Sequence, residues 1–358
     1  MIDQMIKPSS KTTLVKRSEV EIAILRTLSY AEVFHKPMHK TRLYERLLIS
    51  KKISKQLFDQ SVDRLVSAEV IYCSLDYFAL KKQRLLTQIQ IDKLEKENAQ
   101  RSKNAVNAGK IFRVVPTVRE VYLTGSSATE TPDEFDDLDF FVVTHPNSVW
   151  ITRLLLVLIT TLIGRYAPPV RNFSTSNHDK TGLHLESKHD STSSANSTST
   201  GWSGVYKSNR THAFCLNMWA SEDALAVPVA KQSIFTAHEI LFARPLLDST
   251  SSLFHENGWA RQYFGNLPAR KEAKNKNQGN QGYQGYQGES VFRKSARLIL
   301  SSLDHFAYAF QLLYMKKHRT IEVVARSHAY FHPRDTGAIV LNRYRDILKK
   351  YAIDLHKH

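Results

Sequence analysis

Apolar and polar residues alternate or cluster along the middle of the chain in a way that predicts β-strands separated by helices. An apolar run ends at Leu123, and a second apolar run, Phe140–Val143, follows an acidic loop. A third candidate strand covers Ala213–Ala220, and its alternation predicts that Cys215, Asn217 and Trp219 share one face. We therefore expect a mixed β-sheet with flanking helices over residues 118–250, within an α+β protein.

Residues 18–82 show a different pattern, typical of a winged helix-turn-helix. Apolar residues at helical spacing predict one helix, and two further helices are expected at Thr41–Leu48 and after the N-cap residue Ser54. Two short alternating runs around Ser74-Leu75-Asp76 then predict a hairpin, the wing. A winged helix is typical of DNA binding. The third helix, however, exposes a mixed rather than a basic face, which favours a structural or protein-binding role.

The rest of the chain divides by composition. Residues 83–117 predict a connecting helix. Residues 290–358 predict a helical region in which Leu298, Leu303, Phe306, Phe310 and Leu313 form one buried face. The segment His328–Thr336 is expected to end a helix at Pro333. Three segments poor in large apolar residues predict a flexible leader (1–17), a disordered insertion (175–210) and a low-complexity linker (271–289).

Charge and cysteine content indicate which partners and which cellular compartment to expect. The 358 residues include 50 Lys and Arg against 34 Asp and Glu, a net charge of +16, which favours polyanionic partners such as RNA. Two cysteines suggest no disulfide framework, so we expect a reducing cytoplasm. No signal peptide is recognisable, and the apolar run Leu154–Ile163 is too short to span a bilayer, so no membrane association is expected. The oligomeric state stays open.

The stretch from Leu123 to Val143 carries the candidate chemistry. Asp137 and Asp139 are two apart on an expected strand, so their carboxylates point the same way. Like charges held close together indicate a cation between them, and Mg²⁺ prefers such hard oxygen ligands. Gly125 and Ser126, in the preceding turn, offer backbone N–H groups and a hydroxyl to a phosphate. Together these residues predict a metal–nucleotide site.

This pattern resembles the signature of the DNA polymerase beta-like nucleotidyltransferase superfamily: a strand, a Gly-Ser turn, about ten residues, and Asp-x-Asp on the next strand. The likeness is most specific over about thirty residues, Thr124–Arg153, with a further segment at Cys215–Trp219. The resemblance implies transfer of a nucleoside monophosphate from an NTP to an acceptor hydroxyl, assisted by two Mg²⁺ ions. It also implies that Asp137 and Asp139 are catalytic metal ligands and that Gly125 and Ser126 bind the nucleotide.

The chain departs from the family pattern at two places. Ala128-Thr129-Glu130 stands where many active members have an Arg, and Asn217 stands where a third catalytic carboxylate is expected. Two alternatives to an active transferase therefore remain: a catalytically weakened NTP-binding sensor, and a winged-helix nucleic-acid-binding regulator. The acceptor and the preferred base are not encoded in a linear motif.

Overall fold

The structure is a computed structural model that describes most of the chain, namely residues 17–131, 136–167, 213–246, 252–268, 291–316, 323–331, 335–351 and 353. The predicted insertion (175–210), the linker (271–289) and all but the last residue of the leader (1–17) lie outside the described residues. The described residues form two compact units. One lies within Met1–Leu86, Gln262–Leu267 and Arg343–His358, and the other within Thr87–Arg261 and Pro268–Asn342.

The N-terminal part of the first unit contains the three predicted helices and a small antiparallel sheet, which has three strands where the sequence predicts a two-stranded hairpin. The helices are α1 (Glu19–Val33), α2 (Lys40–Glu45) and α3 (Lys55–Ser67). The strands β1 (Met38–His39), β2 (Tyr72–Ser74) and β3 (Tyr77–Ala79) pair in the order β1-β3-β2. A short 3₁₀ helix, η1 (Lys82–Arg84), follows β3.

Local sequence signals account for several ends in this unit. The Ser54 side chain accepts a hydrogen bond from the Leu57 N–H and so caps α3. Leu75 and Asp76 both have positive φ, 50° and 60°, which suits a two-residue hairpin turn between β2 and β3. On α3 the side chain of Leu57 is exposed, and Phe58 takes the buried position beside Val62.

The second unit is built on a seven-stranded mixed sheet, so the predicted α+β class and mixed sheet are confirmed. The order is β8-β4-β5-β7-β10-β9, and β6 pairs with the start of β7. β4 and β5 are antiparallel, whereas β5 and β7 are parallel. The strands are β4 (Val118–Thr124), β5 (Leu138–Thr144), β6 (Tyr166–Ala167), β7 (Phe214–Ser221), β8 (Arg244–Pro245), β9 (Val323–Val324) and β10 (His328–Tyr330).

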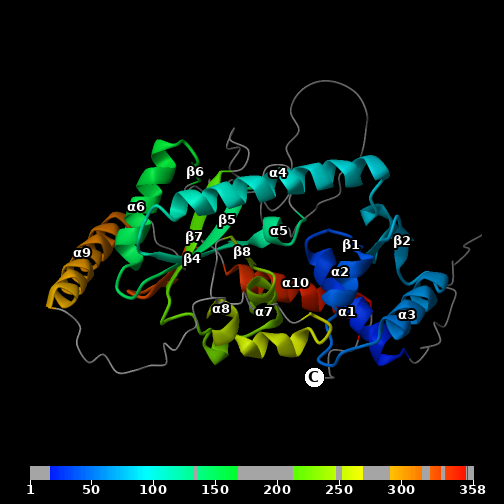
Figure 1. The fold of residues 1–358 in the computed structure, drawn as a ribbon. Coiled ribbons are helices and arrows are strands. Elements are labelled where there is room, and N and C mark those ends of the chain that lie inside the picture. Colours follow the sequence, from blue (N-terminus) through cyan, green and yellow to red (C-terminus); the bar gives the residue numbers. More distant parts are fainter. Residues whose placement is uncertain are drawn as a thin grey trace, which may run out of the picture. The chain divides into compact units, whose positions relative to one another are not determined.

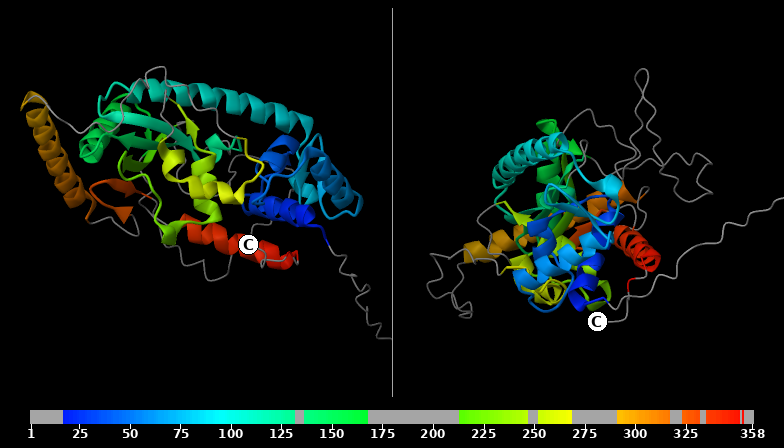
Figure 2. Two further views of the ribbon diagram at one scale, coloured as in Figure 1. Left: turned by 60° about the horizontal axis from the view of Figure 1, so that its bottom comes forward. Right: turned by 90° about the vertical axis from the view of Figure 1, so that its right-hand side faces the viewer.

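Helices cover both faces of this sheet (Figures 1 and 2). Residues of α4 (Gln88–Phe112), α6 (Val149–Leu162) and α9 (Val291–Met315) pack with Leu123 and Phe140 in one core. Residues of α7 (Ile234–Leu241) and α8 (Ser252–Glu256) pack with Tyr122 and Phe141 in the other. The remaining helices are α5 (Gly125–Ala128), α10 (Thr336–Lys350), η2 (Val229–Lys231) and η3 (Gly258–Tyr263).

The C-terminal part differs from the prediction of a helical region. Residues His328–Tyr330 do not end a helix but form β10, which pairs antiparallel with Met218–Ala220 of β7. His332 and Pro333 lie outside the described residues. The long-range pairing with β7 overrides the local proline signal, and it makes this segment part of the sheet.

The predicted buried face of α9 is also wrong. Leu298, Leu303, Phe306, Phe310 and Leu313 are 50–72% exposed. The helix instead buries Asp304, Ala307, Gln311 and Met315. The N-cap residue of α6 provides no side-chain cap, so the first N–H groups of that helix need another acceptor. The Asp304 carboxylate accepts hydrogen bonds from the N–H groups of Trp150 and Ile151, and this contact turns the Asp304 side of α9 inward.

Candidate metal–nucleotide site

The two aspartates of the predicted site lie at the start of β5. Asp139 pairs with Thr124, the last residue of β4, on one side and with Cys215, near the start of β7, on the other. It shares the sheet face of Phe141, two residues along β5. Asp137 precedes the strand and is close enough to Asp139 to raise its pKa. The structure thus brings the two predicted carboxylates together.

Gly125 lies directly against the Asp139 carboxylate. Its φ of +66° is a left-handed conformation that favours glycine, and a Cβ atom placed there would lie 2.7 Å from Oδ2 of Asp139. Gly125 is also the first residue of the short helix α5, so the backbone turns sharply as β4 ends. A residue without a side chain is therefore required both by the turn and by the close approach of the carboxylate.

Ser126 and the end of the acidic loop are fixed by hydrogen bonds. The Ser126 hydroxyl donates to Oδ2 of Asp136 at 2.6 Å. Arg101 of α4, almost fully buried, donates to the backbone carbonyl of Asp136 at 2.7 Å and to the Ser127 hydroxyl at 3.2 Å. One guanidinium thus ties the turn after β4 to the segment before β5. The loop residues Asp133 and Glu134 lie outside the described residues.

The electrostatics of the aspartates are those of carboxylates crowded by other carboxylates. Burial raises the pKa of Asp137 to about 6, with a further contribution from Asp136. Burial also raises the pKa of Asp139 to about 7, and the charges of Asp137, Asp136 and Glu239 add to this. A hydrogen bond from the Cys215 thiol acts in the opposite direction. A bound cation would favour the ionised forms of both groups.

Glu239 is a site residue that the sequence reasoning missed. It extends from α7, and its carboxylate accepts a hydrogen bond from the backbone N–H of Gly125. Burial raises its pKa to about 7, although the Gly125 N–H acts to lower it. The one available signal was a single acidic residue in the otherwise apolar or neutral helix IFTAHEIL. Only the fold places it beside a turn more than a hundred residues earlier.

Asn217 does not lie where the sequence alternation predicts. Asp139 pairs with Cys215, whereas Phe141 pairs with Met218, so β7 contains one extra residue at this point. This bulge puts Trp219 into the core with Phe140, on the face opposite to Phe141. The prediction that Cys215, Asn217 and Trp219 share a face is therefore wrong. Cys215 occupies the position beside Asp139, and Asn217 is buried with no hydrogen-bond partner for Oδ1 within the described residues.

The carboxylates of Asp137 and Asp139 fit a cation that also binds a ligand, rather than one that protein side chains alone coordinate. Among the described residues, no group of three or more His, Cys, Asp or Glu side chains is arranged to hold a metal ion. Magnesium commonly takes one or two carboxylates and completes its shell with substrate phosphates and water. Asp137 and Asp139 provide such a pair next to the Gly125 turn.

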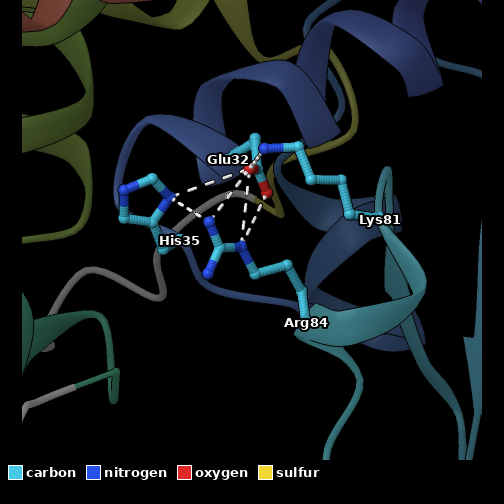
Figure 3. A network of polar contacts seen from close by, with 4 residues as sticks. All are labelled: Glu32, His35, Lys81 and Arg84. Carbon is cyan, nitrogen blue, oxygen red and sulfur yellow. Dashed lines mark hydrogen bonds and ion pairs between the residues drawn. The ribbon is translucent and has the colours of Figure 1, made fainter. Parts of the chain in front are cut away.

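A second buried carboxylate, in the first unit, has the opposite surroundings. Glu32 of α1 is 4% exposed, and Lys81 and Arg84 point toward it from the segment after β3 (Figure 3). The Lys81 ammonium lies 2.6 Å from Oε1 and the Arg84 Nε 3.4 Å from Oε2. Nη2 of Arg84 also lies 2.7 Å from Nδ1 of His35, whose pKa is lowered by burial and by Arg84. The charge of the Glu32 carboxylate is therefore already compensated by Lys81 and Arg84.

Comparison of the chain with protein-family models, with curated proteins and with solved structures gave no match. Within the part of the chain that the structure describes, no helix has the combination of length and apolar character needed to cross a membrane. The site geometry is therefore the basis for any functional assignment.

Proposed function

We propose that this protein is a metal-dependent nucleotidyltransferase of the DNA polymerase beta-like superfamily, which transfers an NMP group from an NTP to an acceptor hydroxyl. One observation carries the proposal: the Asp139 carboxylate lies against a left-handed Gly125, at the junction of β4 and β5. Two carboxylates and a tight turn at one end of a sheet are what a metal-bound triphosphate requires.

Each site residue has a distinct role in this proposal. Asp137 and Asp139 hold Mg²⁺, which when bound neutralises charge on the triphosphate. The Gly125 N–H and the Ser126 hydroxyl bind phosphate oxygens. Both donors bond to carboxylates in this structure, Gly125 to Glu239 and Ser126 to Asp136. A triphosphate would take over these hydrogen bonds, and protonation of Glu239, with its pKa of about 7, would assist the exchange.

The experiment is incubation of the full chain with Mg²⁺, α-labelled NTPs and a cell extract. Transfer predicts label on a macromolecule or metabolite, and its loss in Asp137→Ala. The matched control is Asp63→Ala, which removes an exposed carboxylate from α3 in the other unit. Absence of both label and NTP binding would refute the proposal.

The catalytically weakened NTP sensor is the second candidate, and the position of Cys215 favours it. A neutral thiol, with a pKa raised by burial and by Asp139, occupies the strand position beside Asp139 where a third carboxylate would serve. A thiol is a poor ligand for Mg²⁺. In the same experiment the sensor predicts magnesium-dependent NTP binding without transfer of label.

We also propose that the first unit is a winged helix, supported by its three helices and the β1-β3-β2 sheet. Charged residues of α3 have partners of opposite sign, because Asp59 pairs with Lys40 of α2 and Arg64 pairs with Glu21 of α1. This balance favours a protein-binding or structural role over DNA readout. Salt-sensitive DNA binding by the full chain, measured as a gel-mobility shift, would instead favour DNA readout. We retain the cytoplasm as the proposed location.

A further inference from the structure

The outward face of α9 is an apolar stripe that no described part of the chain covers. More than half of the exposed large hydrophobic side chains among the described residues lie on α6, its C-cap Ile163 and α9. On α9 the exposed members include Phe306 at 71%, Phe310 at 65% and Leu313 at 72%. Monomeric proteins rarely expose contiguous apolar surface of this kind, and such a patch marks an interaction site.

The buried side of α9 holds the helix to its own domain by polar contacts as well as by the apolar side chains of Ala307 and Met315. Asp304 accepts the N–H groups of Trp150 and Ile151 at 2.7 and 2.9 Å. Gln311 donates to the Trp150 carbonyl at 2.9 Å and accepts from the Arg153 guanidinium. Both polar residues are fully or almost fully buried, while most of the large apolar side chains of α9 are exposed. Figure 1 shows α9 beside α6, the helix that supplies these contacts.

The spacing of the stripe specifies another helix as its partner. The exposed residues are separated by four, three, four and three positions, which is the a/d repeat of a coiled-coil seam; they are Ile299, Leu303, Phe306, Phe310 and Leu313. A seam with this repeat presents knobs that fit between the side chains of a facing helix with the same repeat. Among the described helices, α9 carries the longest exposed run with this repeat, and α6 has a shorter one at Leu155, Leu158 and Leu162.

We propose that two copies of this chain associate through their α9 helices, forming a symmetric dimer with α9 packed against α9. Between Leu298 and Met315 the helix has no exposed Asp, Glu, Lys or Arg side chain, so the seam offers no charge that would select a foreign partner. The same absence lets two chains, each with a net charge of +16, meet there without local repulsion. A self-complementary apolar patch is what a two-fold interface uses.

The exposed area is sufficient for a stable dimer. Taking about 200 Å² per large side chain, the five seam residues present roughly 600 Å² per copy, against about 800 Å² per partner in a standard interface. Leu298 and Tyr314 flank the seam on α9, and α6 exposes Leu158 and Leu162, so the remaining area is available nearby. This proposal is independent of the nucleotide site.

The test is sedimentation velocity of the full chain from about 10 nM to 100 µM, so that dissociation of either a tight or a weak dimer falls within the range. We expect a species of twice the chain mass. The double variant Phe306→Glu/Phe310→Glu should weaken the dimer by about 100-fold or more, because each charge would be buried without a partner. His305→Glu, exposed on the same helix but off the seam, is the matched control and should leave the dimer intact.

Three results would overturn the proposal. These are a monomer throughout the concentration range, a dimer that survives the double variant, and a monomer that binds phosphatidylcholine–phosphatidylserine vesicles through this face. Circular dichroism checks that each variant stays folded. If the double variant loses helix content, Phe306→Ser/Phe310→Ser replaces it, with the same expected loss of the dimer.

Discussion

The two carboxylate clusters of this protein differ in what surrounds them. Glu32 is nearly fully buried, and its partners are Lys81, Arg84 and His35. Asp139 is partly buried, and the charged groups that act on it are Asp137, Asp136 and Glu239, all acidic. The first cluster is complete as a structural ion-pair network. The second concentrates negative charge, and a divalent cation from solution would complete it.

The largest effect expected from this comparison is on Glu32. Glu32→Ala would leave Lys81 and Arg84 beside a buried position without their counter-charge, at a cost of about 3 kcal/mol in the free energy of unfolding. Urea unfolding measures it. The control is Glu19→Ala, on the same helix, whose pair with Lys51 is exposed and should contribute less than about 1 kcal/mol. Equal losses in the two variants would contradict the distinction.

The next effect concerns the close approach at the turn. Gly125→Ala would force a side chain into a left-handed conformation and against the Asp139 carboxylate, so we expect a loss of about 1–3 kcal/mol together with loss of NTP binding. Gly258→Ala is the control, because a Cβ atom there meets nothing within 4 Å. Thermal unfolding of both variants measures the difference in stability. A Gly125→Ala protein as stable as Gly258→Ala would refute the required contact.

Neutralising Asp139 should raise the stability of the protein above pH 7, whereas removing the Glu32 carboxylate should lower it. Its pKa is raised from the ordinary 3.8 to about 7, so between these pH values the folded state holds a proton that the unfolded state has released. The stability contributed by this group is therefore full below pH 3.8 and is lost as the pH rises through 7. Without metal, Asp139→Asn should be more stable than the wild type at pH 8, by about 1–2 kcal/mol after solvent screening, and equal to it near pH 4.

Urea unfolding at both pH values measures this difference. A variant that is less stable than the wild type at pH 8 would show that Asp139 makes a favourable contact in the metal-free protein, as Glu32 does.

The smallest effect is on the pKa of Asp139 itself. Removing a neighbouring negative charge should lower this pKa in both Asp137→Asn and Glu239→Gln, and Asp137 contributes more than Glu239. NMR titration of the Asp139 carboxyl carbon measures the shift. Glu222→Gln is the control, since Glu222 is not among the groups that act on Asp139. If the pKa of Asp139 is unchanged in Glu239→Gln, Glu239 does not belong to the site.

Local patterns predicted the parts of the fold that depend on neighbouring residues. The cap at Ser54 and the hairpin at Leu75-Asp76 follow from side-chain chemistry and turn preferences, and the influence of Asp137 on Asp139 follows from their spacing of two residues. The placement of Gly125 in a tight turn follows in the same way.

What the sequence did not reveal depends on distant pairing. The bulge in β7, which places Cys215 rather than Asn217 beside Asp139, arises from its register with β5. Glu239 reaches the site only because α7 packs on the same sheet face. The stripe on α9 was visible in the sequence, but hydrophobic spacing alone does not say whether the same chain covers it.

The most direct test of the central claim is calorimetric titration of the metal-free protein with an NTP, with and without Mg²⁺, compared with Asp139→Asn. The account predicts that NTP binding requires Mg²⁺ and is lost in the variant. Binding of the same strength without Mg²⁺, or binding retained by Asp139→Asn, would contradict it.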